Sequence, residues 1–576
     1  MATTTYREAA LTNNYEFTGG GGYQLPEYPF VEPPELHSST PVRHPVVIVG
    51  GGITGLTLAC SLARLGVCAV LLDEDNTVGV KGASSRGICY TQKSLEIFER
   101  LGIFERIAAK GVQWSVGRTF AGDDEVYSFD LRQQGNFHLS SQPPFINIQQ
   151  FYIEGFLVER TQELGVVDLR WQNRLTGFEQ NADCATLTIE TPAGTYQLEA
   201  EHVIDATGSH SPLRKWLNVP FDSKRGDDRW CIADVRFTTH PPQERHTWIE
   251  APFNENRAVW QHLMADDVWR IDYQMAPNAD PEYVSREDVV RERLARQFGA
   301  EVEVEIVWVG PYAYRSECVH AMRHGRVFLM GDSAKVVSPF GARGGNTGVA
   351  DADNLAWKLA AVLSGKADSA LLDSYNDERL DAAQQNVCVT NRTARFLRPA
   401  DGTERVFRQA AIGLAKQHPF ARSLINTGRM AVANAYARSR ACTYAPTSAA
   451  GQSVQNVGFK WANGKRGDVN DLLDWAHGDL LLLVFGNLPA AASQRLRRLC
   501  QDAPVRSVQV LGARGAAQAL EHVRDPQGHL QGACQVSDQA WALVRPDGYL
   551  AATGATINTQ LVQAIERSLG LLGDRA

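Results

Sequence analysis

The chain has 576 residues, which exceeds one ordinary domain and predicts two to four domains, each large enough to bury its own core. Its 57 Lys and Arg and 65 Asp and Glu give a formal charge of −8, without long runs of like charge. This balance argues against a nucleic-acid partner, because the basic stripe that phosphates require is missing, and it favours a small-molecule ligand.

The ten cysteines include no CxxC pair and no paired Cys/His spacing. They indicate reduced thiols, no metal site and a cytoplasmic protein. We expect no signal peptide, because the first residues lack a basic and then apolar order. The weakly charged run at 46–72 contains glycines and Arg64, so we expect no membrane segment there.

Residues 1–43 contain four consecutive glycines and scattered prolines, with little apolar periodicity. They predict an N-terminal extension that either wraps the surface or stays mobile. The pattern then changes to a continuous apolar run at 45–49, which is typical of a buried parallel strand. Residues 54–66 have helical spacing, and 68–75 form a second predicted strand that ends in acidic residues. Together these segments predict a βαβ unit.

The turn of this unit carries Gly50, Gly52 and Gly55 in a GxGxxG pattern, and Asp73 follows Gly55 by 18 residues. Glycines at these positions allow a tight turn, a close approach of the backbone to a pyrophosphate and tight helix–strand packing. Asp73 ends the second strand, where a carboxylate can accept a hydrogen bond from a ribose hydroxyl. We therefore predict dinucleotide binding. The alternative is a glycine turn that serves packing alone.

Three later segments alternate in a strand-like way, at 229–237, 257–264 and 268–275, and predict an antiparallel sheet. After residue 359 the chain is predicted to be mostly helical up to about residue 440. A stretch rich in Pro, Ser and Gly is a predicted linker to a last domain. That domain contains two predicted strands, DLLLLVFG and QAWALVRPDGYLAA.

Three blocks of sequence carry a resemblance to a known family. They are the GxGxxG unit with SSRGICYTQKSLEIFERLGI, the segment VIDATGSHSPLRKWL, and the segment RVFLMGDSAKVVSPFGARGGNTGVADADNLAWKL. They resemble the FAD-dependent aromatic hydroxylases, which are class A flavoprotein monooxygenases of the para-hydroxybenzoate and phenol hydroxylase superfamily. The similarity runs from about His44 to Arg440. The segment LVRPDGYLA further resembles the thioredoxin-like C-terminal domain of the longer members.

The resemblance implies an α/β fold with a discontinuous Rossmann-like FAD-binding domain at 44–225 and 310–400. An inserted antiparallel β-sheet domain at 226–309 would bind the substrate. A helical linker at 401–445 would lead to a thioredoxin-like C-terminal domain at 446–576. Because that domain lacks CxxC, we predict a structural or dimer-contact role for it rather than thiol chemistry.

The resemblance also implies how the cofactor is held. Asp332 would accept a hydrogen bond from the ribityl chain, with a turn or helix-capping aspartate as the alternative. Pro339 would lie at the flavin edge, near the substrate. The bare backbone of Gly344, Gly345 and Asn346 would face the isoalloxazine ring, where hydrogen bonds from the backbone support catalysis.

The helix after this run is expected to open near Thr347, and its partial positive charge would stabilise the anionic reduced flavin. Arg86 matches the family arginine near the FAD pyrophosphate, with a surface salt bridge as the alternative. Gln150 matches the flavin-contacting glutamine, with Gln149 as an off-by-one alternative. Thr207 stands where the family has an aspartate, so the proposed role of that aspartate in FAD and NAD(P)H handling is in doubt here.

The resemblance implies a monooxygenase that uses FAD, NADH or NADPH, and O2 to hydroxylate a small aromatic compound. The expected substrate is phenolic, the expected intermediate is a flavin C4a-hydroperoxide, and the expected assembly is a homodimer. Strand alternation puts Trp260 and His262 on one face of the middle sheet, as substrate contacts or as ordinary core residues. A flavin oxidase, a hydroxylase of N-heteroaromatics and a non-catalytic binding protein remain alternatives. A halogenase is disfavoured because the chain contains no WxW.

Overall fold

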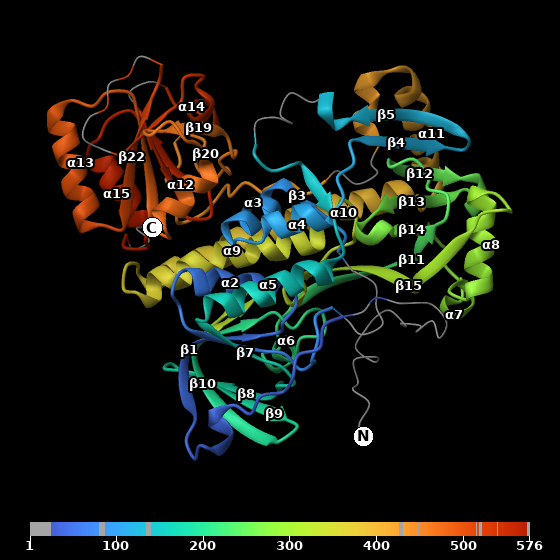
Figure 1. The fold of residues 1–576 in the computed structure, drawn as a ribbon, viewed down its shortest axis with the longest axis horizontal. Coiled ribbons are helices and arrows are strands. Elements are labelled where there is room, and N and C mark those ends of the chain that lie inside the picture. The colour runs from blue at the N-terminus through green and yellow to red at the C-terminus, as the bar shows by residue number, and fades with distance from the viewer. Residues whose placement is uncertain are drawn as a thin grey trace.

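A computed structural model describes most of the chain (Figure 1). Three large β-sheets lie around the long helix α9 (Arg343–Leu363), which crosses the middle of the molecule. In the described part of the chain, no helix has both the length and the apolar composition for a bilayer crossing. The described residues are 23, 25–79, 87–133, 140–425, 430–445, 448–513, 515, 517, 521–537 and 540–572.

The first sheet is mostly parallel and holds the predicted βαβ unit. Its strands are β1 (Val42–Val49), β2 (Ala69–Leu72), β7 (Val167–Arg170), β8 (Arg174–Gln180), β9 (Ala185–Thr191), β10 (Gly194–Asp205), β16 (Arg323–His324) and β17 (Val327–Leu329). The order is β16-β17-β10-β1-β2-β7, and β8 and β9 extend β10 in an antiparallel way. Val46, Val47 and Ile48 of β1 are fully buried. A continuous apolar run suits such a strand, because helices cover the sheet.

Helices α2 (Ile53–Arg64) and α5 (Gln150–Leu164) lie above this sheet in Figure 1, between it and α9. The unit β1, α2, β2 therefore has the predicted parallel arrangement. Other helices of the first 300 residues are α3 (Gln92–Arg100), α4 (Phe104–Lys110), α6 (Pro212–Trp216), α7 (Pro281–Val284) and α8 (Glu287–Phe298).

The second sheet is the predicted antiparallel one, with the order β18-β15-β11-β14-β13-β12-β4-β5. Its strands are β4 (Val116–Ala121), β5 (Asp124–Asp130), β11 (Phe221–Phe237), β12 (Arg245–Ala251), β13 (Arg257–Leu263), β14 (Trp269–Gln274), β15 (Val304–Val319) and β18 (Lys335–Val336). The three predicted segments correspond to β11, β13 and β14, with β14 between the other two; the predicted second segment extends one residue beyond its strand, and the third extends one residue beyond each end of its strand. Strands β4 and β5 also belong to this sheet, although they precede the predicted insertion, because β4 pairs in parallel with β12. A small separate sheet pairs β3 (Cys89–Thr91) with β6 (Phe145–Asn147).

Helices α10 (Asp373–Leu397) and α11 (Gly402–Gln417) lead to the third sheet, which has the order β20-β19-β23-β22-β21-β24-β25. The segment predicted as its last strand is a hairpin of β24 and β25. All ten cysteines of the chain are free thiols. The remaining elements are β19 (Gly458–Trp461), β20 (Arg466–Asp468), α12 (Val469–Ala476), β21 (Leu480–Phe485), α13 (Ala490–Asp502), β22 (Val505–Leu511), β23 (His522–Arg524), α14 (His529–Ala533), β24 (Trp541–Val544), β25 (Leu550–Gly554) and α15 (Thr559–Ser568).

A buried ionic cluster ties the third sheet to α9 and α10. Arg545, just after β24, donates to the two carboxylate oxygens of Glu378 on α10 at 2.5 and 2.8 Å, and to Asp547 at 2.5 Å. Lys358 on α9 donates to Glu378 at 2.8 Å. All four side chains are at most 1% exposed. We call Lys358, Glu378, Arg545 and Asp547 the anchor cluster.

The described part of the N-terminal extension packs on the rest of the protein. Tyr28 stacks on Trp171, just after β7, with ring centroids 4.4 Å apart. Tyr23 reaches the second sheet, where its hydroxyl donates to Asp234 of β11 at 3.0 Å. These residues therefore wrap the surface, which is one of the two predicted alternatives. Residues 1–22 and 24 lie outside the described part.

Candidate active site

The first glycine loop joins β1 to α2. Gly50 has a φ of +110°, and a Cβ atom there would lie 2.4 Å from the carbonyl oxygen of Ala206. A Cβ atom on Gly55 would lie 2.0 Å from the carbonyl oxygen of Gly50. At Gly52 a Cβ atom would meet only Glu154 Oε1, at 4.0 Å, among the described residues. Two of these glycines therefore permit close packing, and the third presents bare backbone to open space.

Asp73 follows β2 directly and faces this loop. The amide of Gly51 donates to its Oδ2 at 2.5 Å, and the amide of Asp75 donates to its Oδ1 at 2.8 Å. Burial raises the pKa of the Asp73 carboxyl to about 7, although both amides act to lower it. The backbone thus holds this carboxyl group against the loop that is predicted to bind the dinucleotide.

The second glycine run forms the first turn of α9. The helix begins at Arg343, four residues before the predicted start at Thr347, because Ala342 takes a left-handed conformation (φ 55°, ψ 42°) and ends the preceding turn. Gly344 and Gly345 consequently lie in the first turn, where backbone N–H groups have no partner within the helix. These N–H groups and the helix dipole favour a negatively charged ligand group at this turn.

Asn346 fastens this turn to β3. Its Nδ2 donates to the carbonyl oxygens of Cys89 and Ala342 at 2.9 and 2.6 Å. Its Oδ1 accepts from the amide of Thr91 at 2.9 Å. Groups of the protein therefore already form the hydrogen bonds of the Asn346 side chain. A flavin contact through the Asn346 backbone stays a prediction.

Thr54 brings the two glycine regions together. It lies in the first turn of α2, and its Oγ1 would be 2.6 Å from a Cβ atom on Gly331 and 2.3 Å from one on Gly348. Gly331 follows β17 next to Asp332, and Gly348 belongs to α9. The start of α2, the end of β17 and α9 therefore meet at one threonine, and glycine allows both close approaches.

Asp351 on α9 stabilises this junction through hydrogen bonds. It accepts from the amide of Gly331 at 3.0 Å, from Arg379 at 2.7 Å and from the buried Lys335. Burial acts to raise the pKa of Asp351, but Lys335 and Arg379 outweigh it and hold the pKa below its usual range. An ionised, fully bonded carboxylate thus fixes the backbone just before Asp332.

A chain of contacts joins the α9 turn to the first loop. A Cβ atom on Gly345 would lie 3.6 Å from the ring of Tyr90, and one on Gly87 would lie 3.0 Å from the Tyr90 hydroxyl. The amide of Gly87 donates to Gln150 Oε1 at 3.1 Å. The predicted ring-binding residue Gly345 and the predicted flavin-contacting residue Gln150 are therefore linked through β3.

Glu154 on α5 completes this chain at the start of α2. It is 1% exposed and accepts from Gln150 at 2.7 Å, from the amide of Ile53 at 2.9 Å and from the amide of Gly79 at 2.8 Å. A carboxylate is favourable here because the helix start carries partial positive charge. Both predicted halves of the cofactor site thus form one connected region.

Other predicted residues lie around this region. Asp332 and Pro339 are both exposed. Gln149, the off-by-one alternative, donates to the carbonyl oxygen of Ala265 near the second sheet at 3.0 Å, so its side chain serves another contact. Arg86 lies outside the described residues.

Thr207 binds the neighbouring aspartate of its own segment. Its hydroxyl and amide both donate to Asp205 Oδ1, at 2.6 and 3.1 Å, and the hydroxyl of Ser211 donates to the other oxygen. Burial raises the pKa of the Asp205 carboxyl, and these donors oppose the shift. The acidic group of this segment is therefore buried and occupied by local contacts.

Phe340, next to Pro339, packs against the second sheet. Its ring centroid lies 5.2 Å from that of Trp260 and 6.3 Å from that of Trp230. Trp260 and His262 are 6% and 8% exposed, and their rings are in edge contact at 6.3 Å. The predicted Trp260 and His262 pair therefore shares one face, and this aromatic face meets the segment that leads into α9.

A row of ionisable side chains crosses the same face. His262 lies opposite Arg270, and Arg270 lies opposite Asp234. His246 of β12 pairs with Gln261 of β13, so the next pair in the same antiparallel register places Arg245 opposite His262. Arg270 donates to Asp234 at 2.9 Å, so these two charges compensate each other. The Nε of Arg245, by contrast, is buried without a hydrogen-bond partner in the described chain.

Burial and the two arginines set the ionisation of this face. Burial, Arg245 and Arg270 together lower the pKa of His262 well below its usual range, so the imidazole is neutral. Burial raises the pKa of the Asp272 carboxyl to about 7, and its Oδ1 has no hydrogen-bond partner among the described residues. Asp272 lies directly opposite Trp260 in the sheet. The face thus combines aromatic rings with a carboxyl group that titrates near neutral pH.

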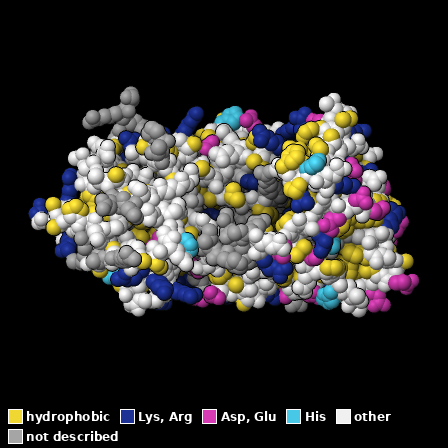
Figure 2. All heavy atoms as spheres, turned by 90° about the horizontal axis from the view of Figure 1, so that it is seen from above, with side chains coloured by type: hydrophobic (Ala, Val, Ile, Leu, Met, Phe, Trp, Pro, Cys, Tyr) yellow, Lys and Arg dark blue, Asp and Glu magenta, His cyan; other side chains and the backbone are white. Residues whose placement is uncertain are grey.

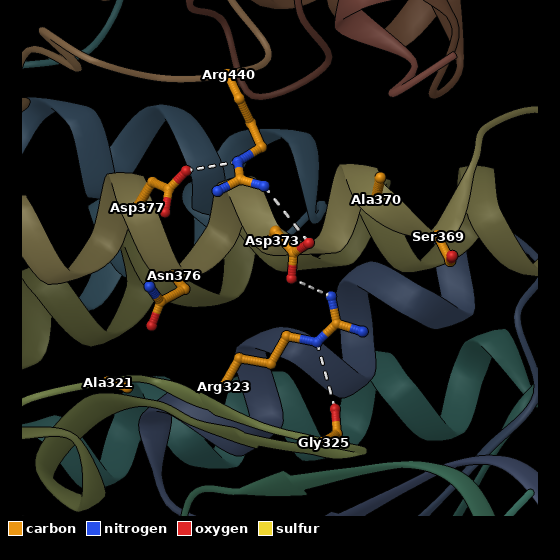
Figure 3. A pocket seen from close by; sticks show the side chains of 9 residues that line it. All are labelled: Ala321, Arg323, Gly325, Ser369, Ala370, Asp373, Asn376, Asp377 and Arg440. Carbon is orange, nitrogen blue, oxygen red and sulfur yellow. Dashed lines mark hydrogen bonds and ion pairs between the residues drawn. The ribbon is translucent and has the colours of Figure 1, made fainter. Parts of the chain in front are cut away.

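A surface pocket of about 560 Å³ lies apart from these residues, beside β16 and the start of α10 (Figure 3). Its charged side chains pair with each other: Arg323 with Asp373 at 2.6 Å, and Arg440 with Asp377 at 2.7 Å. None of the predicted site residues lines it. We therefore do not assign a ligand to this pocket.

The fold and the connected site are those of a flavin-dependent enzyme, and the chain belongs to the FAD binding domain family, whose sequence model matches residues 43–390. It is 31% identical over 347 residues to a flavin-dependent monooxygenase of Mycobacteroides abscessus, covering 59% of this chain and 71% of that protein. It is 25% identical over 563 residues to a 3-(3-hydroxy-phenyl)propionate/3-hydroxycinnamic acid hydroxylase of Klebsiella pneumoniae, covering 95% and 98%.

Solved structures of the same fold include the flavin-dependent monooxygenase PieE in complex with FAD and substrate. It has a TM-score of 0.78 at 24% identity and covers 92% of this chain and 100% of that chain. Aklavinone-11 hydroxylase in complex with FAD and aklavinone has a TM-score of 0.73 at 22% identity, covering 92% and 99%. These findings confirm the predicted α/β fold and the predicted class, a class A FAD-dependent aromatic monooxygenase.

The described residues fit FAD. Gly52 and Gly345 present bare backbone at two helix starts that lie in one connected region. Between them, the hydroxyl of Tyr90 is buried and has no hydrogen-bond partner in the described chain. A buried polar group without a partner is costly, so its presence indicates a ligand that supplies one.

We expect Tyr90→Phe to weaken FAD binding without lowering the stability of the apoprotein. Removal of an unpartnered hydroxyl leaves no group unsatisfied, so the free energy of unfolding should stay equal or rise. The dissociation constant for FAD should rise about 5- to 10-fold, since a typical hydrogen bond contributes about 1 kcal/mol. Flavin fluorescence titration and urea unfolding of the apoprotein measure the two quantities. A less stable apoprotein with unchanged FAD affinity would contradict this role.

Sequence reasoning did not single out Tyr90 or Arg245. Tyr90 lies inside the first of the three blocks that carry the resemblance, but its unbonded hydroxyl depends on the folded packing around β3. Arg245 begins β12, whose alternating pattern RHTWIEA was a usable strand signal, because Thr247, Ile249 and Ala251 all point inward.

Proposed function

We propose that the protein hydroxylates a small phenolic compound with O2 and uses NADH or NADPH to reduce its FAD. The observation that carries this proposal is the packing of Phe340 against Trp260 and Trp230, which joins the aromatic face of the second sheet to the segment before α9. The relative named as a hydroxylase of 3-(3-hydroxy-phenyl)propionate supports an aromatic hydroxyl compound as the substrate class.

Bound FAD would supply the two-electron chemistry and the activation of oxygen. The first loop and Asp73 would hold its adenosine end, Asp332 the ribityl chain, and the first turn of α9 the ring. Negative charge on the reduced ring would be stabilised by the N–H groups and the dipole of that turn. The residues assigned to the cofactor are Gly50, Gly52, Gly55, Asp73, Arg86, Gln150, Asp332, Gly344, Gly345 and Asn346.

The second sheet and Pro339 would serve the substrate. Phe340 and Trp260 would exclude water and orient the aromatic ring. Asp272 would accept the proton of the phenol, because its carboxyl pKa of about 7 suits proton transfer near neutral pH. His262 is neutral and adds no positive charge beside the phenolate.

The direct test is a panel of phenols and hydroxylated N-heteroaromatics with purified protein and either NADH or NADPH. We expect a yellow protein whose NAD(P)H oxidation is stimulated by an aromatic compound, and a product that gains one oxygen atom in mass. A colourless protein without flavin affinity contradicts the proposal. Anaerobic reduction of the flavin by the substrate alone would instead identify an oxidase.

We expect Asp332→Ala to weaken FAD retention by about 10-fold or more, because it removes an exposed acceptor of a charge-assisted hydrogen bond. The ratio of flavin to protein after gel filtration measures this effect. Asp183→Ala, which removes an exposed aspartate away from the site, is the matched control and should leave the ratio unchanged. Full flavin content in the Asp332 variant would remove its assignment.

We also propose a homodimer. Large apolar side chains are exposed on α11 and on the segment Pro419–Leu424, including Val406 at 66%, Phe407 at 57% and Phe420 at 72%. Figure 2 looks onto this side of the molecule, and hydrophobic side chains gather in its right half, while Lys and Arg are scattered. An apolar surface of this kind is typical of a protein contact.

A further inference from the structure

The hairpin of β24 and β25 in the third sheet turns at residues 545–549. The amide of Gly548 donates to the carbonyl oxygen of Arg545 at 2.8 Å, and the amide of Arg545 donates to that of Tyr549 at 2.8 Å. Asp547 in the middle of the turn is 1% exposed, and its carboxylate accepts from Arg545 at 2.5 and 3.1 Å. The turn therefore keeps its shape through its own hydrogen bonds.

Asp547 bonds to two helices at once. Its carbonyl oxygen accepts from Nζ of Lys93, in the first turn of α3, at 3.0 Å. Its carboxylate accepts from Nδ2 of Asn354 on α9 at 3.2 Å. The ammonium group of Lys93 also lies 5.6 Å from the ring centroid of Tyr549. One residue of the turn therefore fixes the start of α3 relative to α9.

Both helices lead directly to the predicted binding site of the flavin ring. Lys93 follows by three residues Tyr90 of β3, whose hydroxyl is buried without a partner in the described chain. The first turn of α9 contains Gly345 and Asn346, and Asn346 accepts from the amide of Thr91 at 2.9 Å. Because helices are stiff, a shift of α3 against α9 at the turn would change the distance between Tyr90 and Gly345.

A separate contact holds the far end of α3, which lies against both α9 and α12 (Figure 1). Arg100 pairs with Asp353 of α9 at 2.7 Å and donates to Asn470 of α12 at 2.9 Å. Asn470 in turn donates to the carbonyl oxygen of Glu96 at 3.0 Å. The end of α3 is thus held by α12, and its start by the contact of Lys93, which is the contact nearer to β3.

We propose that the turn at 545–549 positions the FAD site, with Asp547 and Lys93 as positioning residues. The inference rests on the proposed assignment of Tyr90 and the first turn of α9 to FAD. It gives the third sheet, to which no cofactor residue is assigned, a share in flavin binding. A binding site must hold its groups within about 0.5 Å, so the spacing of α3 and α9 affects affinity. Coupling between two sites is reciprocal, so bound FAD must in turn stabilise the contact at the turn.

The test compares Lys93→Met with Lys366→Met. Lys366 follows α9 and also links this part of the protein to the third sheet, because it pairs with Asp479 at 2.8 Å, but it does not involve α3. Fluorescence titration measures the dissociation constant for FAD where urea unfolding shows a fully folded apoprotein, so a loss of stability alone does not enter. Visible circular dichroism at saturating FAD reports the surroundings of the bound ring.

Hydrogen exchange, with and without FAD, supplies the reciprocal measurement. The amides of Arg545 and Gly548 in the turn are compared with those of β22 in the same sheet. This comparison separates an effect at the turn from a general gain in stability, which would slow both sets of amides alike.

We expect Lys93→Met to raise the dissociation constant for FAD about 5- to 20-fold and to change the visible circular dichroism of the bound flavin. In wild type, FAD should slow exchange at the turn more than at β22, and Lys93→Met should reduce this difference. Lys366→Met should behave as wild type in all three measurements. A lysine that served structure alone would lower stability without changing the spectrum of the flavin.

Unchanged FAD affinity and an unchanged flavin spectrum in Lys93→Met would overturn the inference. Equal losses in Lys93→Met and Lys366→Met would also overturn it, because they would reflect a general loosening of the protein. If Lys93→Met fails to fold, the exchange measurement on wild type decides, since equal slowing at the turn and at β22 would contradict the coupling. A protein that shows the coupling but hydroxylates no phenol would contradict the proposed function and still support the role of the turn.

Discussion

Replacing Arg545 by methionine should lower the free energy of unfolding by about 3–5 kcal/mol, because it leaves the buried carboxylates of the anchor cluster without their main partner. Glu378 would keep Lys358, Asn354 and Ser439, and Asp547 would lose its bond of 2.5 Å to Arg545. Burial acts to raise the pKa of Glu378, but Arg545 and Lys358 outweigh it and lower the pKa far below its usual range. Because the folded-state pKa of Glu378 is lowered, its ionised carboxylate stabilises the wild type above the unfolded-state pKa. The difference in free energy of unfolding between wild type and Arg545→Met should therefore narrow below about pH 4.5.

Urea unfolding at several pH values measures this effect. Arg506→Met is the matched control in the same domain, because its ion pair with Asp479 at 3.4 Å involves an arginine that is 44% exposed. Its loss should change stability by about 0–1 kcal/mol. The double variant Arg545→Met with Glu378→Gln should lose less than the sum of the single variants, since one unpaired charge is removed. Equal effects of Arg545→Met and Arg506→Met would show that the anchor cluster does not stabilise the fold.

Gly348→Ala should cause the loss of most of the bound flavin. It should also lower the free energy of unfolding by about 1–3 kcal/mol, because the added methyl group overpacks a close contact. The new methyl group would lie 2.3 Å from Thr54 Oγ1. The Thr54 side chain has few alternative rotamers, and Gly331 packs closely against it on another side, so it has little room to move. The start of α2 would therefore move away from α9 and separate the two glycine regions that we assign to FAD.

A second substitution can restore the lost space. Thr54→Ala removes the clashing oxygen and leaves a distance of 3.5 Å between the two Cβ positions, which is an ordinary contact. The double variant should therefore regain flavin, as measured by the flavin-to-protein ratio. Gly413→Ala is the control, because it lies in α11 with no described atom within 4 Å and should gain up to about 1 kcal/mol from helix propensity. Failure of Thr54→Ala to rescue flavin binding would argue against this contact as the cause.

The sequence predicted the elements whose signal is local. The βαβ unit around Gly50 was readable because a buried strand, a helix and a second strand follow one another without interruption. The strands around Trp260 were readable from alternation alone. Strand β4 was not assigned to the second sheet, since its parallel pairing with β12 joins segments that are far apart in the chain.

The site was predictable only in part for a similar reason. The start of α9 was expected at Thr347, but a left-handed residue at Ala342 sets it at Arg343, and sequence gives no strong reason for alanine to adopt that conformation. The burial of the Arg245 Nε without a hydrogen-bond partner among the described residues depends on how the strands around it pack. Such a property arises from many residues at once, so no single motif carries it.

The contact of Tyr23 with Asp234 means that the second sheet is completed by a segment outside the family match, which begins at residue 43. Shortened versions of the protein designed from the family boundary would lack this tyrosine. They would retain every glycine of the two regions that we assign to FAD and would still alter the partners of Asp234 and, through it, of Arg270. Comparisons of substrate preference among relatives should therefore align this leading segment as carefully as the catalytic domain.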